Sequence, residues 1–219
     1  MMPYKDFHYI YPPRPEHKIP PSDLSKFDNG EFLAQPKYNG TCCLIFTNGK
    51  ETHLYNRHKK EFGYIPPNME LSKLAHTNKW YVYAGEYLNK GKLGENKVKA
   101  KDKIVLWDIL VWDGEYLIGD TLLTRLALLE ETYPCQRAIV TEDGLEMYTH
   151  LCHTGLKGIY KAPTYTRQFE LLYHDIIETD LYEGLVIKKM DSTLKYGFNE
   201  QNNNDWQVKC RKETKVYNF

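Results

Sequence analysis

The sequence lacks most features that assign a chain of 219 residues to a specialised class. No apolar run approaches the ~20 residues that a membrane-spanning helix needs, so we expect no membrane partner. The first fifteen residues contain no apolar segment of the kind that secretory signals carry. Neither sign of charge is in excess, because 29 basic side chains stand against 29 acidic ones. This balance argues against a general polyanion binder but permits local basic surfaces.

Cysteine occurs five times, and no two cysteines have the Cys-x-x-Cys spacing of many metal and redox sites. The adjacent pair Cys42 and Cys43 is a poor disulfide framework, and the number of cysteines is odd. We therefore expect a protein of a reducing compartment, the cytoplasm. The length suits one domain with a packed core.

Common nucleotide and hydrolase motifs are absent as well. Neither GxGxxG nor GxSxG occurs in the sequence. The segment from Gly85 to Lys92 resembles a P-loop, but five residues separate its glycines instead of four, and Leu93 follows where Ser or Thr would bind magnesium. The two closely spaced histidine pairs lack a Cys or acidic ligand at zinc spacing. We interpret those histidines as structural or surface residues.

The chain divides into two expected parts. Residues 1–30 form an N-terminal arm, because five of the eleven prolines fall within 11–21 and predict an extended, polyproline-like segment. Residues 31–219 form the folded domain. Asn48-Gly49 predicts a hairpin between the apolar runs 41–46 and 52–56.

Short strands dominate the rest of the domain. Apolar spacing of three and four residues predicts helices over 121–133 and 166–180, and a short helix over 69–76. β-Branched and aromatic runs predict further strands over 32–37, 80–88, 103–119, 183–190 and 206–211. Strands and helices do not alternate steadily, so we predict an α+β fold with antiparallel sheets.

The first candidate for chemistry is a lysine at the end of a predicted strand, in the segment QPKYNGTCCLIF. The amine of Lys37 is a candidate nucleophile, because a strand end can bury and activate it. Gly40, three residues later, lets backbone or a ligand approach closely. Lys-x-x-Gly alone is a weak pattern, since a surface lysine beside a turn has the same spacing.

Further charged and aromatic residues follow Lys37 in a fixed order: Arg57 in YNRHKKEFGY, Glu86 in YAGEYL, Trp107 and Asp108 in LWDIL, Glu183 and Lys188 in EGLVIK, and Lys209 and Arg211 in VKCR. This set resembles the covalent nucleotidyltransferase superfamily of polynucleotide ligases and messenger-RNA capping enzymes. The corresponding family motifs are KxDG, an SRxG-like, a DGEL-like and an FD-like motif, EGxVxK and a final Lys-x-Lys. The resemblance covers roughly residues 35–212.

The resemblance implies a fold and a reaction. The fold would be the antiparallel-sheet adenylyltransferase core of DNA ligases, which is ATP-grasp-like. Only seven residues follow Lys212, too few for the five-stranded OB domain of most relatives, so we expect no OB domain. Lys37 would attack the α-phosphate of ATP, expel pyrophosphate and hold AMP as a phosphoramidate, with Mg²⁺ or Mn²⁺ as the metal.

The resemblance also implies roles for the other motif residues. Glu183 would bind the metal, and Glu86 would either join it or bind the ribose hydroxyls. Trp107 would stack on the adenine ring. Cations would stabilise the charge of the transferring phosphate. The remaining expected nucleotide-binding residues are Gln35, Arg57, Lys188 and Lys209.

Three departures from the family motifs concern the nucleic-acid substrate. Asn39 replaces the Asp of KxDG, Cys42 stands where many DNA ligases have an arginine, and Lys209 lies one residue further from Trp206 than usual. We expect a monomeric, phage- or virus-like enzyme that joins 5′-phosphate to 3′-hydroxyl in nicked duplex DNA. The alternatives are an RNA or mixed-strand ligase, a capping guanylyltransferase, and an inactive nucleic-acid-binding module.

Two basic segments are candidates for binding the duplex in place of an OB domain. Residues 89–103 contain six lysines and two acidic residues, and their two glycines predict an irregular, exposed and mobile loop. We expect Lys97, Lys99 and Lys101 to contact backbone phosphates there. Arg211, in the basic segment near the C-terminus, is a further candidate.

Overall fold

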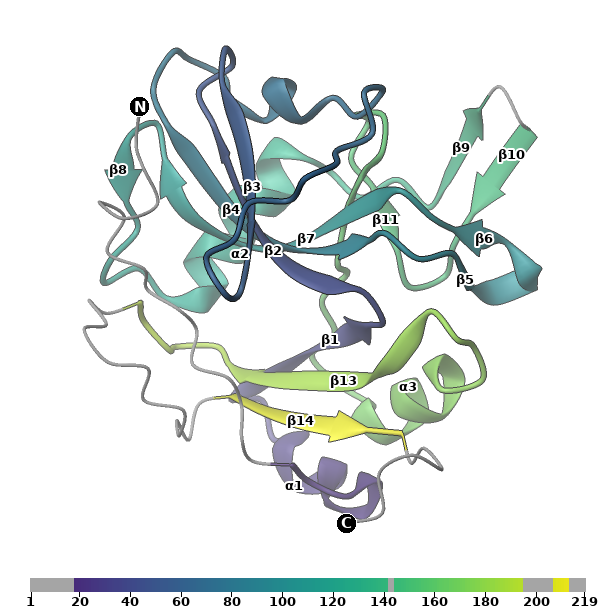
Figure 1. Ribbon diagram of the computed structural model, residues 1–219. Coiled ribbons are helices and arrows are strands. Elements are labelled where there is room, and N and C mark those ends of the chain that lie inside the picture. Colours follow the sequence, from purple (N-terminus) through teal and green to yellow (C-terminus); the bar gives the residue numbers. More distant parts are fainter. Residues whose placement is uncertain (1–17, 142–143, 195–206, 213–219) are drawn as a thin grey trace.

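A computed structural model describes residues 18–141, 144–194 and 207–212, which form two main sheets with helices packed on them and two further hairpins (Figure 1). The strand order of the large sheet is β11-β12-β7-β4-β2-β3, and β8 pairs with β7. Its strands are β2 (Thr41–Thr47), β3 (Thr52–Asn56), β4 (Tyr81–Leu88), β7 (Lys103–Trp112), β8 (Glu115–Tyr116), β11 (Cys152–His153) and β12 (Ile159–Lys161). The small sheet has the order β1 (Phe32–Tyr38), β13 (Tyr182–Lys189) and β14 (Gln207–Arg211).

The predicted α+β class is confirmed, but the sheets are not wholly antiparallel. β12 pairs with β7 in parallel, whereas the other pairs of named strands are antiparallel. β12 is only three residues long, and a strand of that length has no readable periodicity. The predicted hairpin at Asn48-Gly49 is confirmed: Asn48 Oδ1 accepts from the amides of Lys50 and Glu51, and Gly49 has φ +83°.

Three helices cover the sheets. α2 (Leu122–Thr132) begins at Thr121, whose side chain accepts from the amide of Thr124, and packs against β7. α3 (Phe169–Ile176) packs on β13 together with α1 (Leu24–Phe27). α1 and α3 lie on the side of the small sheet that faces away from the large sheet (Figure 1). The other face of the small sheet is therefore turned toward the large sheet.

Short elements complete the described residues: the 3-10 helices η2 (Pro21–Asp23), η3 (Leu71–Leu74) and η4 (Glu95–Lys97), and the hairpins β5 (Lys92–Leu93) with β6 (Lys99–Ala100) and β9 (Ala138–Thr141) with β10 (Gly144–Met147). Within the described residues, no helix has the length and apolar character needed to cross a membrane.

Part of the expected proline-rich arm is packed on the domain. Residues 1–17 and Trp206 lie outside the described residues. From Lys18 onward the chain is in contact with the small sheet, because the amide of Ile19 donates to the carbonyl of Lys209 at 3.0 Å. Leu24 of α1 is fully buried in the same core as α3.

Two other expectations differ from the structure. Residues 89–103, expected to be irregular, include the β5–β6 hairpin, whose Gly94 lies close to the side chains of Leu181 and Tyr148. Glycine at this position permits the close packing that a side chain would prevent. The cysteine pattern predicted reduced thiols, but Cys135 and Cys152 form a disulfide, and their separation of 17 residues carries no sequence signal.

Candidate active site

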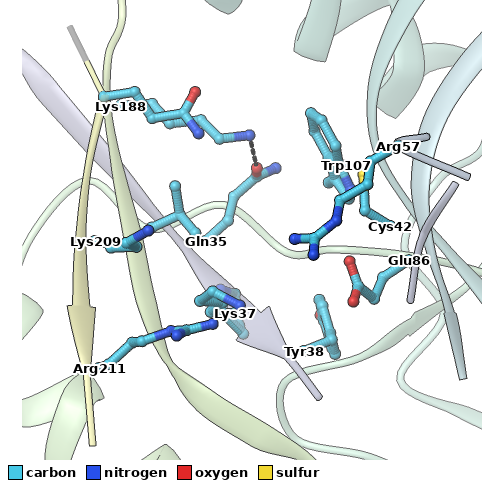
Figure 2. A pocket seen from close by; sticks show the side chains of 13 residues that line it. Gln35, Lys37, Tyr38, Cys42, Arg57, Glu86, Trp107, Lys188, Lys209 and Arg211 are labelled. Atoms are coloured by element: carbon cyan, nitrogen blue, oxygen red, sulfur yellow. Dashed lines mark hydrogen bonds between the residues drawn. The ribbon is translucent and has the colours of Figure 1, made fainter. Parts of the chain in front are cut away.

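A cleft of about 200 Å³ lies between the two sheets, and its lining includes most of the motif residues (Figure 2). From the small sheet, alternate residues of β1, β13 and β14 face the cleft in three rows, since side chains alternate along a strand. The rows are Lys37–Gly184–Arg211, Gln35–Val186–Lys209 and Leu33–Lys188–Gln207. The large sheet contributes Cys42, Glu86 and Trp107, and Arg57 follows β3.

A β-bulge places Glu183 beside Lys37. Alternation along β13 would point Glu183 away from the cleft, but the pairing of β1 with β13 shifts between Lys37 and Tyr38. Gly184, with φ +132°, makes this shift possible, and a Cβ there would lie 2.0 Å from the carbonyl oxygen of Cys210. The glycine of the Glu-Gly pair is thus required by the backbone that orients the glutamate.

Lys37, Glu183 and Arg211 form one charged group. The Lys37 ammonium donates to Glu183 Oε2, and Arg211 Nη2 donates to the same oxygen at 2.8 Å. Burial would raise the pKa of Glu183, but the two neighbouring cations outweigh burial and hold the pKa below its ordinary value. Glu183 therefore remains ionised beside Lys37 and Arg211.

Glu86 faces this group from the large sheet. Burial raises the pKa of Glu86 to about 7; Lys37 and the Gly40 amide oppose the rise, and the Glu183 carboxylate adds to it. Gly40 approaches β4 so closely that a Cβ would lie 2.7 Å from the carbonyl oxygen of Tyr87 and 2.9 Å from Glu86 Cγ. The glycine of Lys-x-x-Gly therefore allows the turn between β1 and β2 to lie close to β4.

Lys188 lies at the other end of the cleft from Lys37. Its Nζ donates to Gln35 Oε1 at 2.6 Å and lies 4.5 Å from the centre of the Trp107 ring (Figure 2). The side chain is 3% exposed, and burial lowers the pKa of Lys188 to about 8. Lys188 is one of the expected nucleotide-binding residues, and its amine lies in the cleft beside the Trp107 ring and the Gln35 amide.

A buried ion pair lies behind Trp107. Asp108, the next residue on β7, accepts from Arg125 Nε and Nη2 of α2, each at 2.9 Å. Both side chains are nearly inaccessible, at 3% and 2% exposed. Arg125 also donates to the carbonyl of Asp120 at 2.8 Å, and the Ile109 amide donates to Asp108. The acid of the FD-like motif therefore anchors α2 to the strand that carries Trp107.

The departures from the family motifs have local explanations. Asn39 Nδ2 donates to the carbonyl of Asp180 at 3.1 Å, and the Asn39 amide donates to Leu181. Asn39 therefore anchors the turn after β1, and an ionised Asp has no donor for Asp180. Cys42 lines the cleft and pairs with Glu86 across β2 and β4.

The expected site residues fall into two places. Ten residues with expected or discussed roles lie together at the cleft, namely Gln35, Lys37, Cys42, Arg57, Glu86, Trp107, Glu183, Lys188, Lys209 and Arg211. Arg211, expected to bind nucleic acid, has its guanidinium on Glu183. Lys97, Lys99 and Lys101 are exposed on or beside the β5–β6 hairpin and do not line the cleft. Gln207 was not predicted, because a neutral amide within a strand gives no sequence signal.

The residues present fit a divalent metal held partly by substrate. Within the described part of the chain, no group of three or more His, Cys, Asp or Glu side chains has the arrangement of a metal cage. Magnesium in phosphoryl-transfer sites is commonly bound by one or two carboxylates together with phosphates. Glu183 and Glu86 supply two carboxylates, and the Glu183 carboxylate contributes to the raised pKa of Glu86, a repulsion that a cation would relieve.

Comparison with solved structures identifies the fold. Mycobacterial DNA ligase D, complexed with ATP and MES, superposes with a TM-score of 0.56 at 14% identity, over 84% of this chain and 55% of that one. The ligase domain of M. tuberculosis LigD gives 0.56 at 15% identity, over 91% and 59%. This is the nucleotidyltransferase fold of ATP-dependent DNA ligases.

A Lig E DNA ligase, described as binding DNA with a minimal scaffold, shares this ligase fold. It superposes with a TM-score of 0.50 at 14% identity, over 84% of this chain and 62% of that one. The chain thus spans less than two thirds of each of the three ligase structures. No known protein-family profile and no curated protein matches the sequence.

Proposed function

We propose that the chain is an ATP-dependent polynucleotide ligase that joins 5′-phosphate to 3′-hydroxyl in nicked duplex DNA through a lysyl-AMP intermediate. The observation that carries the proposal is the position of Lys37. Its amine lies in a cleft beside Glu183 and Arg211, and the next row of the small sheet adds Lys209. A primary amine surrounded by cations and two carboxylates suits nucleophilic attack on a phosphate.

In the first step, Lys37 Nζ forms a bond to the α-phosphorus of ATP while the bond from that phosphorus to the pyrophosphate oxygen breaks. The amine must lose a proton, and Glu183 Oε2 already accepts one of its hydrogens. Arg211, Lys209 and Arg57 line the cleft and are placed to stabilise charge on the phosphates. A magnesium or manganese ion held by Glu183 and Glu86 would neutralise charge on the phosphate oxygens.

The later steps would pass AMP from Lys37 to a 5′-phosphate and then release AMP as the 3′-hydroxyl attacks. For the substrate we propose DNA, because the mycobacterial DNA ligase D and the Lig E DNA ligase share the fold of this chain. The Asn39 side chain bonds the Asp180 carbonyl and does not line the cleft, so the departure at this position does not favour RNA over DNA.

Covalent labelling tests the first step. The protein is incubated with α-labelled ATP, and separately with α-labelled GTP, and then resolved by denaturing electrophoresis. We expect label from ATP in the wild type and none in Lys37→Ala, because no other described amine lies against Glu183. Lys73→Ala is the matched control, since Lys73 is exposed and pairs with Glu70 outside the cleft.

Label from GTP alone would instead indicate a capping guanylyltransferase, and persistent label in Lys37→Ala would remove Lys37 as the nucleophile. Absence of label in the wild type would favour an inactive nucleic-acid-binding module. The DNA assignment is tested with nicked duplexes whose broken strand is either DNA or RNA. Faster sealing of the RNA strand would replace DNA by RNA as the substrate.

A further inference from the structure

The bulge that turns Glu183 toward Lys37 is one of two pairings open to β1 and β13. Lys37 pairs with Gly184 and Tyr38 pairs with Tyr182, which leaves Glu183 as the extra residue. Regular pairing would set Tyr38 opposite Glu183 and point that carboxylate away from Lys37. Contacts that hold Tyr38 opposite Tyr182 therefore fix the direction of Glu183.

Both tyrosines are buried and held through their hydroxyl groups. Their rings pack together, with centroids 5.5 Å apart. Tyr38 donates to the carbonyl of His150 at 2.7 Å, and Tyr182 donates to Glu95 Oε1 at 2.7 Å. The amide of His150 donates to the same oxygen of Glu95 at 3.3 Å. One carboxylate oxygen thus joins the two tyrosines, Tyr182 directly and Tyr38 through His150.

Glu95 belongs to the β5–β6 hairpin, because it lies in η4 between the two strands. The hairpin also contacts the start of β13 through its backbone. The amide of Leu181 donates to the carbonyl of Leu93 at 3.1 Å, and Gly94 lies against the Leu181 side chain. The Leu181 carbonyl in turn accepts from the amide of Asn39 at 2.9 Å. The hairpin is therefore connected both to β13 and to the turn after β1.

The charge of Glu95 suits this position. Hydrogen bonds to an ionised acceptor are about twice as strong as those between neutral groups. Burial raises the pKa of Tyr182, and Tyr38 and the Glu95 carboxylate add to the rise, so the Tyr182 hydroxyl remains a donor. Glu95 is not among the residues that line the cleft. Any effect of Glu95 on the reaction must therefore pass through other residues.

We infer that Glu95 is a positioning residue for the Lys37–Glu183 pair and acts through Tyr182. Without the carboxylate, two buried donors lose their acceptor, and β13 can return to regular pairing with β1. Glu183 would then leave Lys37. The hairpin thus supports the active site as well as presenting lysines to solvent. The inference rests on the proposed function for its kinetic test, because that function supplies the reaction of Lys37.

Single-turnover labelling with α-labelled ATP tests the effect on the reaction. Glu95→Ala should lower the maximal rate of label transfer at least about tenfold, because a misplaced reactive group slows chemistry strongly. The ATP concentration that gives half of this rate should change less than about threefold, since the side chains that line the cleft remain. A rise in that concentration with an unchanged maximal rate would overturn the inference.

Two conservative variants identify the hydrogen bond. Glu95→Gln should recover most of the rate, because its amide oxygen still accepts and Glu95 Oε2 has no partner among the described residues. Tyr182→Phe should slow transfer by itself but add little to Glu95→Ala, since both changes remove the same bond. Losses that simply add, or a Glu95→Gln rate as low as that of Glu95→Ala, would overturn the inference. Glu51→Ala is the matched control, because Glu51 is exposed in the turn after β2 and lies outside the cleft lining.

Amide hydrogen exchange, measured by NMR, tests the pairing without any nucleotide. Three amides donate to carbonyls beside the bulge: Asn39 to Leu181, Leu181 to Leu93, and Lys212 to Glu183. In Glu95→Ala they should exchange at least about tenfold faster, while amides between β2 and β4 keep their wild-type rates. Unchanged rates, or an equal acceleration at all amides, would overturn the inference.

The outcomes distinguish this inference from the ligase proposal. Label on the wild type, with unchanged rates in Glu95→Ala and Tyr182→Phe, would overturn the inference and leave the ligase. Absence of label on the wild type would refute the ligase, and the exchange pattern alone would then decide the inference. Tyr182→Phe keeps both tests decisive if Glu95→Ala fails to fold, since it removes one hydroxyl and keeps the ring.

Discussion

Replacing Arg125 by Met should destabilise the protein strongly, because it leaves a buried carboxylate without its cation. Arg125 supplies two hydrogen bonds of 2.9 Å to Asp108, and the side chains are 2% and 3% exposed. In Arg125→Met, Asp108 keeps only the Ile109 amide as a described donor. Removing one partner of a buried pair costs about 3–5 kcal/mol. For a chain of this length, that loss lowers Tm by about 6–20 °C.

Urea unfolding, followed by circular dichroism, measures this loss directly. Lys79→Met is the matched control, because Lys79 pairs with Asp113 at 3.0 Å but is 62% exposed, and exposed pairs contribute about 0–1 kcal/mol. The double variant Asp108→Leu/Arg125→Met should recover most of the stability, since neither charge of the pair remains to be buried without its partner. A loss below about 1 kcal/mol in Arg125→Met would refute the reasoning.

Three further predictions concern the carboxylates and the hairpin. Glu183→Gln should slow adenylylation by orders of magnitude with the fold intact, because the amide neither takes the Lys37 proton nor binds metal well. Single-turnover labelling measures this rate. An unchanged magnesium dependence in the variant would show that Glu183 does not bind the metal. Replacing Lys97, Lys99 and Lys101 together by Ala should flatten the logarithmic salt slope of duplex binding by up to about 3 without changing self-adenylylation, and an identical slope would refute phosphate contacts there. Because the folded state holds the Glu86 proton up to a pKa of about 7, stability should fall as pH rises from about 4.5 to about 7. Urea midpoints should show this slope in the wild type, and its persistence in Glu86→Gln would assign it to another group.

Alternation along strands made much of the fold and cleft predictable from sequence. Gln35 and Lys37 are two residues apart on β1, so a strand over that segment places both on one face. The turn at Asn48-Gly49 and the helix after Thr121 also followed from local residue chemistry. Turns and helix starts of this kind depend on neighbouring residues, so they can be predicted without knowing which strands pair.

What was missed depends on contacts between distant segments. The orientation of Glu183 results from a bulge against β1, and alternation alone would point it away from the cleft. The phosphate role of Lys188 stays a prediction, but its burial against Trp107 and Gln35 depends on three strands together and has no signal in the sequence. The disulfide between Cys135 and Cys152 likewise depends on where the chain after α2 meets β11.

The rows of the small sheet have a fixed spacing, because residues two apart on a strand lie about 6.6 Å from each other. The lysine that would carry AMP lies in the first row, whereas Gln35 and Gln207 lie in the second and third rows. The side chains in the row of Lys188 and Gln207 can therefore be substituted without displacing Lys37. Any shift of register along β13, by contrast, would displace all three rows at once.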